Sequence, residues 1–254
     1  IQKTDTTDLP WQTTNQNEKV IEESNNCHII AGTSFMWSRN EFANTVDYLF
    51  IDEAGQLALI DTLAMAGCCR NMILLGDPQQ LQQPQQGIHP EGNEVSALAH
   101  IMNNKLTIDK EQGIFLERTW RMHPAICAFD SEQFYENKLQ TMDFLQNQQI
   151  CGNTPFAGSG LFHVTANHTS NTNASTQEVE IITTIVNNLT NGSCTWIDEH
   201  NKTTVLRRQD IKIISPYNAQ VQKLQQAIED VAIGTVDKFQ GQEADLVLLG
   251  FTKN

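Results

Sequence analysis

Short apolar runs alternate with polar or amphipathic segments along most of the chain. We expect strands where the apolar runs fall, at 28–33, 48–52, 72–76, 114–119, 161–165, 211–215, 234–236 and 246–251. Between them we expect helices at 18–25, 60–66, 124–135, 177–189 and 219–229. Alternation of strands and helices is typical of an α/β fold with a mostly parallel sheet.

Composition bounds the class of protein. The 254 residues are 39% hydrophobic and 18% charged, enough for one large core or two modest ones. No apolar run approaches the ~18 to 20 residues that span a bilayer, and the N-terminus lacks a secretory pattern. We therefore expect a globular, cytoplasmic protein without a membrane partner. The six cysteines lack a paired two-residue spacing, so neither a zinc site nor a disulfide framework is indicated.

The net charge of −14 is unfavourable for binding nucleic acid, because phosphate backbones are bound largely through Lys and Arg. The charge argues against tight binding by this chain alone. It does not exclude a narrow positive channel, or basic segments elsewhere, since net charge does not say where the charges lie.

Two carboxylates follow the predicted strand at 48–52. Asp52 and Glu53 come directly after the apolar run, which places them at the carboxyl edge of a parallel sheet, where open α/β folds bind ligands. In nucleotide hydrolases one such carboxylate holds Mg²⁺ through its waters and the next polarises the attacking water. We assign the first role to Asp52 and the second to Glu53. The alternative is that both begin a surface turn or cap the next helix.

Polar residues also follow the apolar run that begins at Met72. An Asp-Pro turn at 77–78 leads into two glutamines, and the amide of Gln80 can hydrogen-bond a terminal phosphate or its attacking water without adding charge. The alternative is a tight turn whose glutamines face solvent. Only Gln80 is taken as a candidate.

Five segments in this order resemble the motifs of superfamily 1 helicases, in the branch of the nonsense-mediated-decay and replication-fork helicases. These segments are DEAG (52–55), GDPQQL (76–81), FLERTWRMHP (115–124), SPYNAQ (215–220) and GTVDKFQGQE (234–243). Each match is weak alone, but five in the correct order are specific. The resemblance implies two RecA-like (P-loop NTPase) domains, at 1–112 and 113–254, that use ATP and Mg²⁺ to move on single-stranded nucleic acid, with DNA favoured over RNA.

The resemblance also assigns nucleotide contacts. Arg121 would act as an arginine finger, because its guanidinium is always charged and can stabilise transition-state charge. The alternative is a surface or interdomain salt bridge. Gly241 would let the backbone approach a ligand, although a plain glycine turn explains it equally well, and Glu243 would accept a hydrogen bond from the ribose. Trp120 is expected in the core rather than as a base-stacking platform.

Nucleic-acid contacts are assigned to five further residues. The hydroxyls of Thr33 and Ser34 can donate to phosphates, though both can equally be ordinary turn residues. The resemblance adds Pro216, Tyr217 and Gln240. His123 is expected to be structural, and Pro124 to take the first position of a helix.

The sequence departs from the family pattern in two respects: it lacks the phosphate-binding loop, and it stops at Asn254, just before the place where the family's motif VI would supply another arginine to the nucleotide. It contains no Gly-x-x-x-x-Gly-Lys-Ser/Thr, the loop whose amides and lysine bind the β- and γ-phosphates. Against the family pattern both domains are therefore expected to be incomplete, and the isolated chain to hydrolyse ATP negligibly. The form of the 119–124 segment also resembles bacterial proteins that fuse a RecB-like nuclease upstream. The competing hypotheses are a non-catalytic nucleic-acid-binding or interaction module, and a different nucleotide hydrolase.

Overall fold

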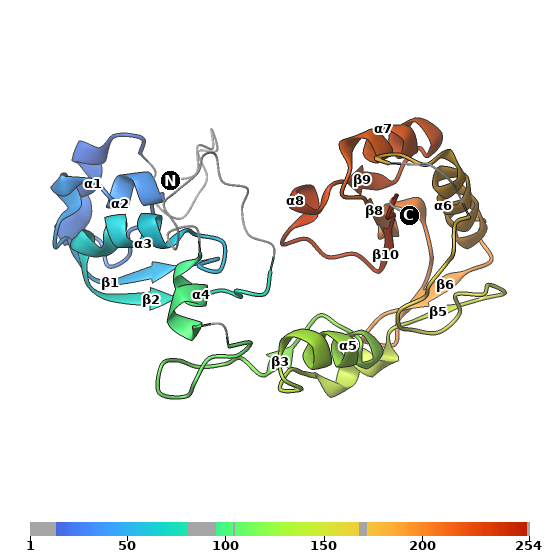
Figure 1. The fold of residues 1–254 in the computed structure, drawn as a ribbon, viewed down its shortest axis with the longest axis horizontal. Helices are drawn as coiled ribbons and strands as arrows, with labels where there is room; N and C mark the ends of the chain where they lie inside the picture. The colour runs from blue at the N-terminus through green and yellow to red at the C-terminus, as the bar shows by residue number, and fades with distance from the viewer. Residues whose placement is uncertain (1–13, 81–94, 104, 168–171, 253–254) are drawn as a thin grey trace. The chain divides into compact units, whose positions relative to one another are not determined.

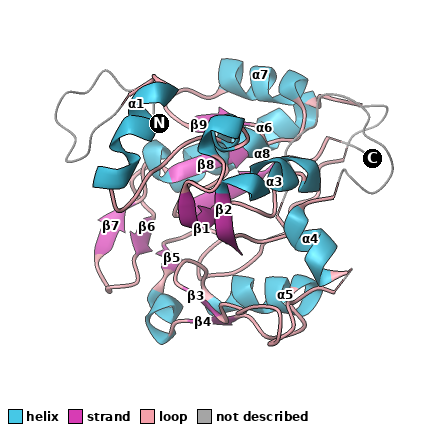
Figure 2. Cartoon of the chain, turned by 90° about the vertical axis from the view of Figure 1, so that its left-hand side faces the viewer, coloured by secondary structure: helices cyan, strands magenta, loops and turns pink. Residues whose placement is uncertain are grey.

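The computed structural model describes residues 14–80, 95–103, 105–167 and 172–252. The chain divides into two compact units, residues 1–115 and 116–254 (Figure 1). Both units contain helices and strands (Figure 2), which alternate along much of the chain. Among the described residues, no helix is long and apolar enough to cross a bilayer.

A parallel pair of strands forms the centre of the first unit. The strand β1 (Val46–Ile51) pairs with β2 (Cys69–Leu74), in a register that places Ile51 opposite Leu74. The helices of this unit are α1 (Asn17–Glu23), α2 (Ser34–Trp37), α3 (Leu59–Met65) and α4 (Ala97–Met102), with 3-10 turns at Ser24–Asn26, Asn40–Phe42 and Ala66–Cys68. The chain passes from β1 to β2 through α3, as expected for a parallel pair.

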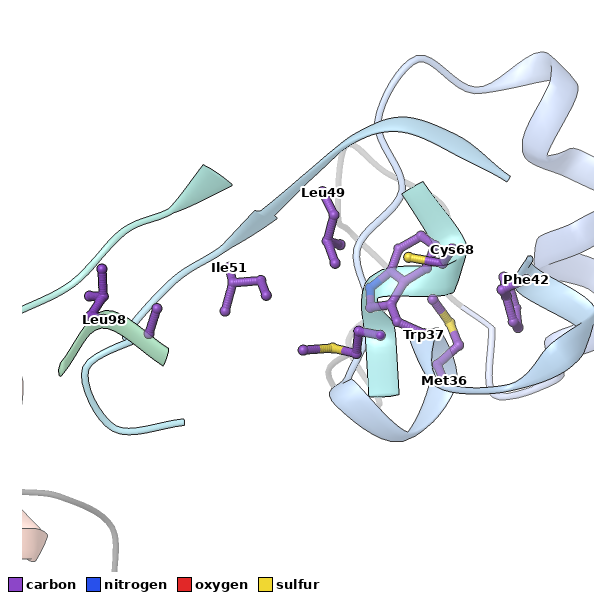
Figure 3. Packing of buried hydrophobic residues seen from close by; sticks show 9 residues of the cluster. Met36, Trp37, Phe42, Leu49, Ile51, Cys68 and Leu98 are labelled. Atoms are coloured by element: carbon purple, nitrogen blue, oxygen red, sulfur yellow. The ribbon is translucent and has the colours of Figure 1, made fainter. Parts of the chain in front are cut away.

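The core of the first unit lies on one face of β1. Side chains alternate along a strand, so Leu49 and Ile51 are buried, whereas Tyr48 and Phe50 point to the other face and are exposed. Leu49 and Ile51 belong to the same cluster as Met36, Trp37, Phe42, Cys68 and Leu98 (Figure 3). This packing holds the carboxyl end of β1 in place.

The second unit contains two three-stranded sheets and a short parallel pair. A parallel sheet has the order β10-β8-β9, formed by β8 (Ile211–Ile214), β9 (Ala232–Gly234) and β10 (Leu246–Leu249). An antiparallel sheet is formed by β5 (Gln149–Cys151), β6 (Thr195–Ile197) and β7 (Thr203–Val205), and β3 (Arg118–Thr119) pairs with β4 (Gln140–Thr141). The helices are α5 (Pro124–Phe134), α6 (Thr176–Leu189), α7 (Asn218–Ala227) and α8 (Val236–Phe239), with 3-10 turns at Asp143–Asn147 and Arg208–Asp210.

The helices α6 and α7 pack together over the parallel sheet. Their apolar faces, represented by Val186 and Leu224, join the fully buried Ile211 and Ile213 of β8 in one core cluster. The start of α6 is fixed by Ser175, whose hydroxyl accepts a hydrogen bond from the backbone N–H of Glu178. The core therefore supports the loops that follow β8 and β9.

Two predicted strands are wrong. Residues 28–33 and 161–165 are irregular, because a strand needs a hydrogen-bonded neighbour and none of the described residues pairs with either run. Within the first run Ile29 is exposed, and only Ile30 packs against the core. The run at 114–119 is reduced to the two residues of β3. The five predicted helices are confirmed, with ends shifted by at most two residues.

Candidate functional site

The turn after β1 carries the two candidate carboxylates. Asp52 and Glu53 are both exposed, and Glu53 has a φ of 54°, in the left-handed region that a non-glycine residue adopts at a cost of about 1–3 kcal/mol. The Asp52 carboxylate accepts a hydrogen bond from the Glu53 backbone N–H at 3.0 Å. The Glu53 carboxylate accepts one from the side-chain amide of Gln56, also at 3.0 Å. A carboxylate has about four lone-pair sites, so each retains acceptor capacity for a metal-bound water or an attacking water.

The turn after β2 lies in backbone contact with the turn after β1. The Leu75 N–H donates to the Ile51 carbonyl, and the Ala54 N–H donates to the Leu75 carbonyl, each at 2.8 Å. A Cβ atom on Gly55 would lie 2.2 Å from the Asp77 carbonyl oxygen, which shows how closely the two turns approach. The structure therefore brings the Asp52 turn and the Gln80 turn to the same edge of the sheet.

Gln80 is held by its own turn. Its side-chain amide donates to the Asp77 carboxylate at 3.3 Å, and its backbone N–H donates to the Asp77 carbonyl at 3.3 Å. The same carboxylate accepts from the backbone N–H of Gln79 at 3.0 Å. The exposed Gln80 is thus oriented by Asp77, while Leu81, the end of the motif, lies outside the described residues.

Arg121 lies in the loop between β3 and α5. Its backbone N–H donates to the Thr119 hydroxyl at 3.3 Å, and the Thr141 hydroxyl donates to the Met122 carbonyl at 2.8 Å. The Arg121 guanidinium donates through Nε to the carboxylate of Glu243, and the two form an ion pair. Two candidate residues of the second unit, 122 positions apart in the sequence, are therefore in direct contact.

The remainder of this loop behaves in part as expected. His123 is structural, because its Nδ1 accepts the backbone N–H of Ala125 at 3.0 Å as the N-cap of α5, and Pro124 takes the first helical position. The prediction for Trp120 is wrong: its side chain is 69% exposed and contacts the ring of Phe144, with centroids 5.8 Å apart. The loop has no helix or strand at this point to carry the indole into the core.

The loop between α8 and β10 carries Gln240, Gly241 and Glu243. Gly241 has a φ of 74°, and a Cβ there would meet nothing within 4 Å, so the backbone conformation and not crowding calls for glycine. The ammonium of Lys212, on β8, donates to the Glu243 backbone carbonyl. Lys212 was not among the candidates. The sequence does carry a sign of its role, because Lys212 is a charged residue inside the apolar run of the central strand. Strands of parallel sheets are usually hydrophobic along their whole length.

Of the nucleic-acid candidates, two lie in the first unit. Thr33 is the N-cap of α2, but its side chain makes no capping hydrogen bond. Ser34 is the first residue of α2 and lines a cavity of about 890 Å³ that Asp52 also lines. The cavity is also lined by residues 45–52, which include β1, and by residues of the irregular segment at 28–33.

The other three nucleic-acid candidates lie in the second unit. Pro216 is exposed, and Tyr217 is half-buried as the N-cap of α7. The turn before α7 is anchored by Gln220, whose buried amide joins the backbone of Ser175 and the carboxylate of Glu178. Sequence reasoning missed this cluster, because a glutamine on a polar helix gives no sign of burial.

Two protein-family models match this chain. A family model described as AAA domain matches residues 93–254, more than half of the chain, and a second AAA domain model matches residues 3–83. The chain belongs to the AAA-domain family. Its α/β units with parallel sheets have the RecA-like P-loop NTPase fold of that family, as predicted.

Several relatives of this AAA-domain chain are helicases by name. It is 29% identical over 224 residues to Helicase sen1 of Schizosaccharomyces pombe, and the matched segment covers 81% of this chain and 12% of that protein. It is 28% identical to the Probable helicase senataxin of Mus musculus (79% of this chain, 8% of that protein). It is 26% identical to the Putative helicase mov-10-B.1 of Danio rerio (82% and 23%). The chain thus spans less than a quarter of each of these relatives, and the matches support a superfamily 1 helicase.

Proposed function

We propose that this chain is part of an ATP-driven motor that moves on single-stranded nucleic acid and separates strands. The observation that carries the proposal is the backbone contact between the Asp52 turn and the Gln80 turn. It gathers a carboxylate pair and an uncharged amide at the carboxyl edge of two parallel strands, the place where this fold binds nucleotide. The helicase names of the relatives support the same reading.

The chemistry of each group fits phosphoryl transfer. Asp52 would hold a Mg²⁺ ion, which would neutralise charge on the phosphates, and Glu53 would polarise the attacking water. Gln80 hydrogen-bonds the terminal phosphate or that water, and Arg121 stabilises the charge of the transition state. Residues 1–112 and 113–254 would be parts of the first and second RecA-like domains.

The track is single-stranded nucleic acid. The hydroxyls of Thr33 and Ser34 bind its phosphates, and the loop residues Pro216, Tyr217 and Gln240 also contact it. The 2′-hydroxyl is what distinguishes RNA from DNA, and no residue in these loops specifies a contact to it. We therefore treat DNA and RNA as two arms of the same test. An upstream nuclease domain belongs to the same proposal, and the sequence of the full-length protein decides it.

The test is ATP turnover by the full-length protein that contains this chain, beside a Glu53→Gln variant. Removing a positioned general base lowers turnover by about 10²-fold to 10⁴-fold. The matched control is Glu180→Gln, because Glu180 is an exposed glutamate on α6, outside the candidate site, and its replacement changes the charge equally. Turnover that survives in the Glu53 variant would remove the proposed role of that residue.

The second candidate function is a non-catalytic module that keeps the fold and binds nucleic acid or protein. The observation that would favour it is a full-length sequence that also lacks the phosphate-binding loop. The same turnover measurement separates the two, because a non-catalytic protein gives no ATP turnover with any polynucleotide.

A further inference from the structure

The ion pair between Arg121 and Glu243 joins two loops of the second unit. Arg121 lies between β3 and α5, whereas Glu243 lies between α8 and β10. The two side chains are 59% and 62% exposed, so both can be reached by a ligand. The family resemblance gives them separate contacts with a nucleotide, but the structure places them in contact with each other.

Both loops are fixed at their backbones. On one side, the Thr119 hydroxyl accepts the Arg121 N–H, and the Thr141 hydroxyl donates to the Met122 carbonyl. On the other side, Lys212 donates from the central strand β8 to the Glu243 carbonyl, and its ammonium also lies 5.5 Å from the centroid of the Phe239 ring. The ion pair therefore joins two backbone segments that the fold already holds.

The pair adds little to the stability of the fold. Exposed ion pairs contribute about 0–1 kcal/mol, since solvent screens the charges and two long side chains lose freedom. Its effect is on orientation. A guanidinium has five N–H donors in a rigid plane. Glu243 engages Nε, so it holds the guanidinium on that side, and the two terminal amino groups keep donors for another anion.

We propose that Glu243 is a positioning residue for Arg121, and that its carboxylate orients the guanidinium toward the terminal phosphate instead of binding the ribose. This inference rests on the proposed function, because it assumes that Arg121 contacts the terminal phosphate. It differs from a ribose contact in one measurable respect. A ribose acceptor stabilises ADP and ATP alike, whereas a residue that orients Arg121 affects only nucleotides that carry the terminal phosphate.

The experiment is calorimetric titration of the full-length protein with ADP and with ATPγS, each in the presence of Mg²⁺. Arg121→Ala is expected to weaken ATPγS binding by about 10-fold or more, as for the loss of a charge-assisted hydrogen bond, and to leave ADP within about 2-fold. Glu243→Ala is expected to weaken ATPγS by about 2-fold to 12-fold, the range that ordering one long side chain costs, and to leave ADP unchanged. The matched control is Glu180→Ala, which removes an exposed carboxylate on α6 and should change neither affinity.

The double variant separates positioning from an independent contact. If Glu243 acts through Arg121, then Arg121→Ala with Glu243→Ala binds ATPγS as weakly as Arg121→Ala alone. A second arm replaces ATP with 3′-deoxy-ATP and 2′-deoxy-ATP in steady-state turnover, where the Glu243→Ala effect should be the same as with ATP.

The inference is overturned if Glu243→Ala weakens ADP and ATPγS equally, or if its effect disappears with a deoxy nucleotide. It is also overturned if the effects of the two single substitutions on ATPγS simply add. Failure of the proposed function is distinguishable from these results, because a wild-type protein that binds neither nucleotide contradicts the function before any variant is compared.

Discussion

Replacement of Gly55 by alanine tests the contact between the two turns of the candidate site. A Cβ at this position would lie 2.2 Å from the Asp77 carbonyl oxygen, 2.6 Å from the Asp77 carbonyl carbon and 3.0 Å from the Pro78 nitrogen. All three are backbone atoms, so no side chain can swing aside to relieve the contact. The turn after β1 must then move away from the turn after β2, by roughly 1 Å if an ordinary carbon–oxygen separation is to be restored.

Two effects follow from that displacement. Overpacking of this kind lowers the free energy of unfolding by about 1–3 kcal/mol. A misplacement of about 1 Å among catalytic groups lowers turnover by about 10²-fold, because Asp52 and Glu53 move relative to Gln80. The assays are urea unfolding and ATP turnover, both on the full-length protein.

Gly67 supplies the matched control. It lies in the first unit between α3 and β2, and a Cβ there would meet nothing within 4 Å. Gly67→Ala is therefore expected to leave turnover unchanged and to be neutral or stabilising by about 0.4–1 kcal/mol. If Gly55→Ala proves as mild as Gly67→Ala in both assays, the backbone contact between the two turns does not exist as described.

Three other predictions concern reactivity, a buried cluster and activity. Burial, together with the neighbouring Cys69, raises the pKa of the Cys68 thiol to about 11, so about one molecule in a thousand is thiolate at pH 8. Labelling with iodoacetamide, followed by mass spectrometry, should therefore modify the exposed Cys27 and spare Cys68. Equal labelling of the two would contradict the buried position of Cys68. Gln220→Leu removes the buried amide that hydrogen-bonds the backbone of Ser175 and the carboxylate of Glu178. Urea unfolding should show a loss of about 1–3 kcal/mol, and an unchanged midpoint would mean that the cluster is hydrated. The isolated 254-residue chain should hydrolyse ATP negligibly, because its sequence lacks the amides and lysine of a phosphate-binding loop; strong turnover by this chain would refute that expectation.

The sequence was informative where structure is local. The start of α6 could be predicted because Ser175 precedes a run of helical spacing with Glu178 three residues later, and α5 begins at Pro124, a residue suited to the first turn. The turns that carry Asp52 and Gln80 follow apolar strands, so their place at the edge of the sheet could also be predicted. In each case the physical cause lies within a few residues of its effect.

Features that depend on distant residues could not be predicted. The apolar run at 28–33 has the composition of a strand, but a strand forms only beside a partner strand. The run itself does not show which segment would be that partner. The three-residue strands of the β5-β6-β7 sheet are too short to show a period. The pairing of Arg121 with Glu243 depends on how the β3 loop and the β10 loop come together, which no local pattern encodes.

The measurement that tests the account most directly is the ratio of ATP turnover with and without single-stranded polynucleotide, made on the full-length protein with DNA and RNA in separate arms. A motor predicts turnover that rises at least about 10-fold with one of them, since a coupling free energy of 1–3 kcal/mol corresponds to a change of about 5-fold to 150-fold. Stimulation by one polynucleotide would also identify the track. Turnover that is absent in both arms, or unchanged by either polynucleotide, would contradict the motor and favour a non-catalytic module.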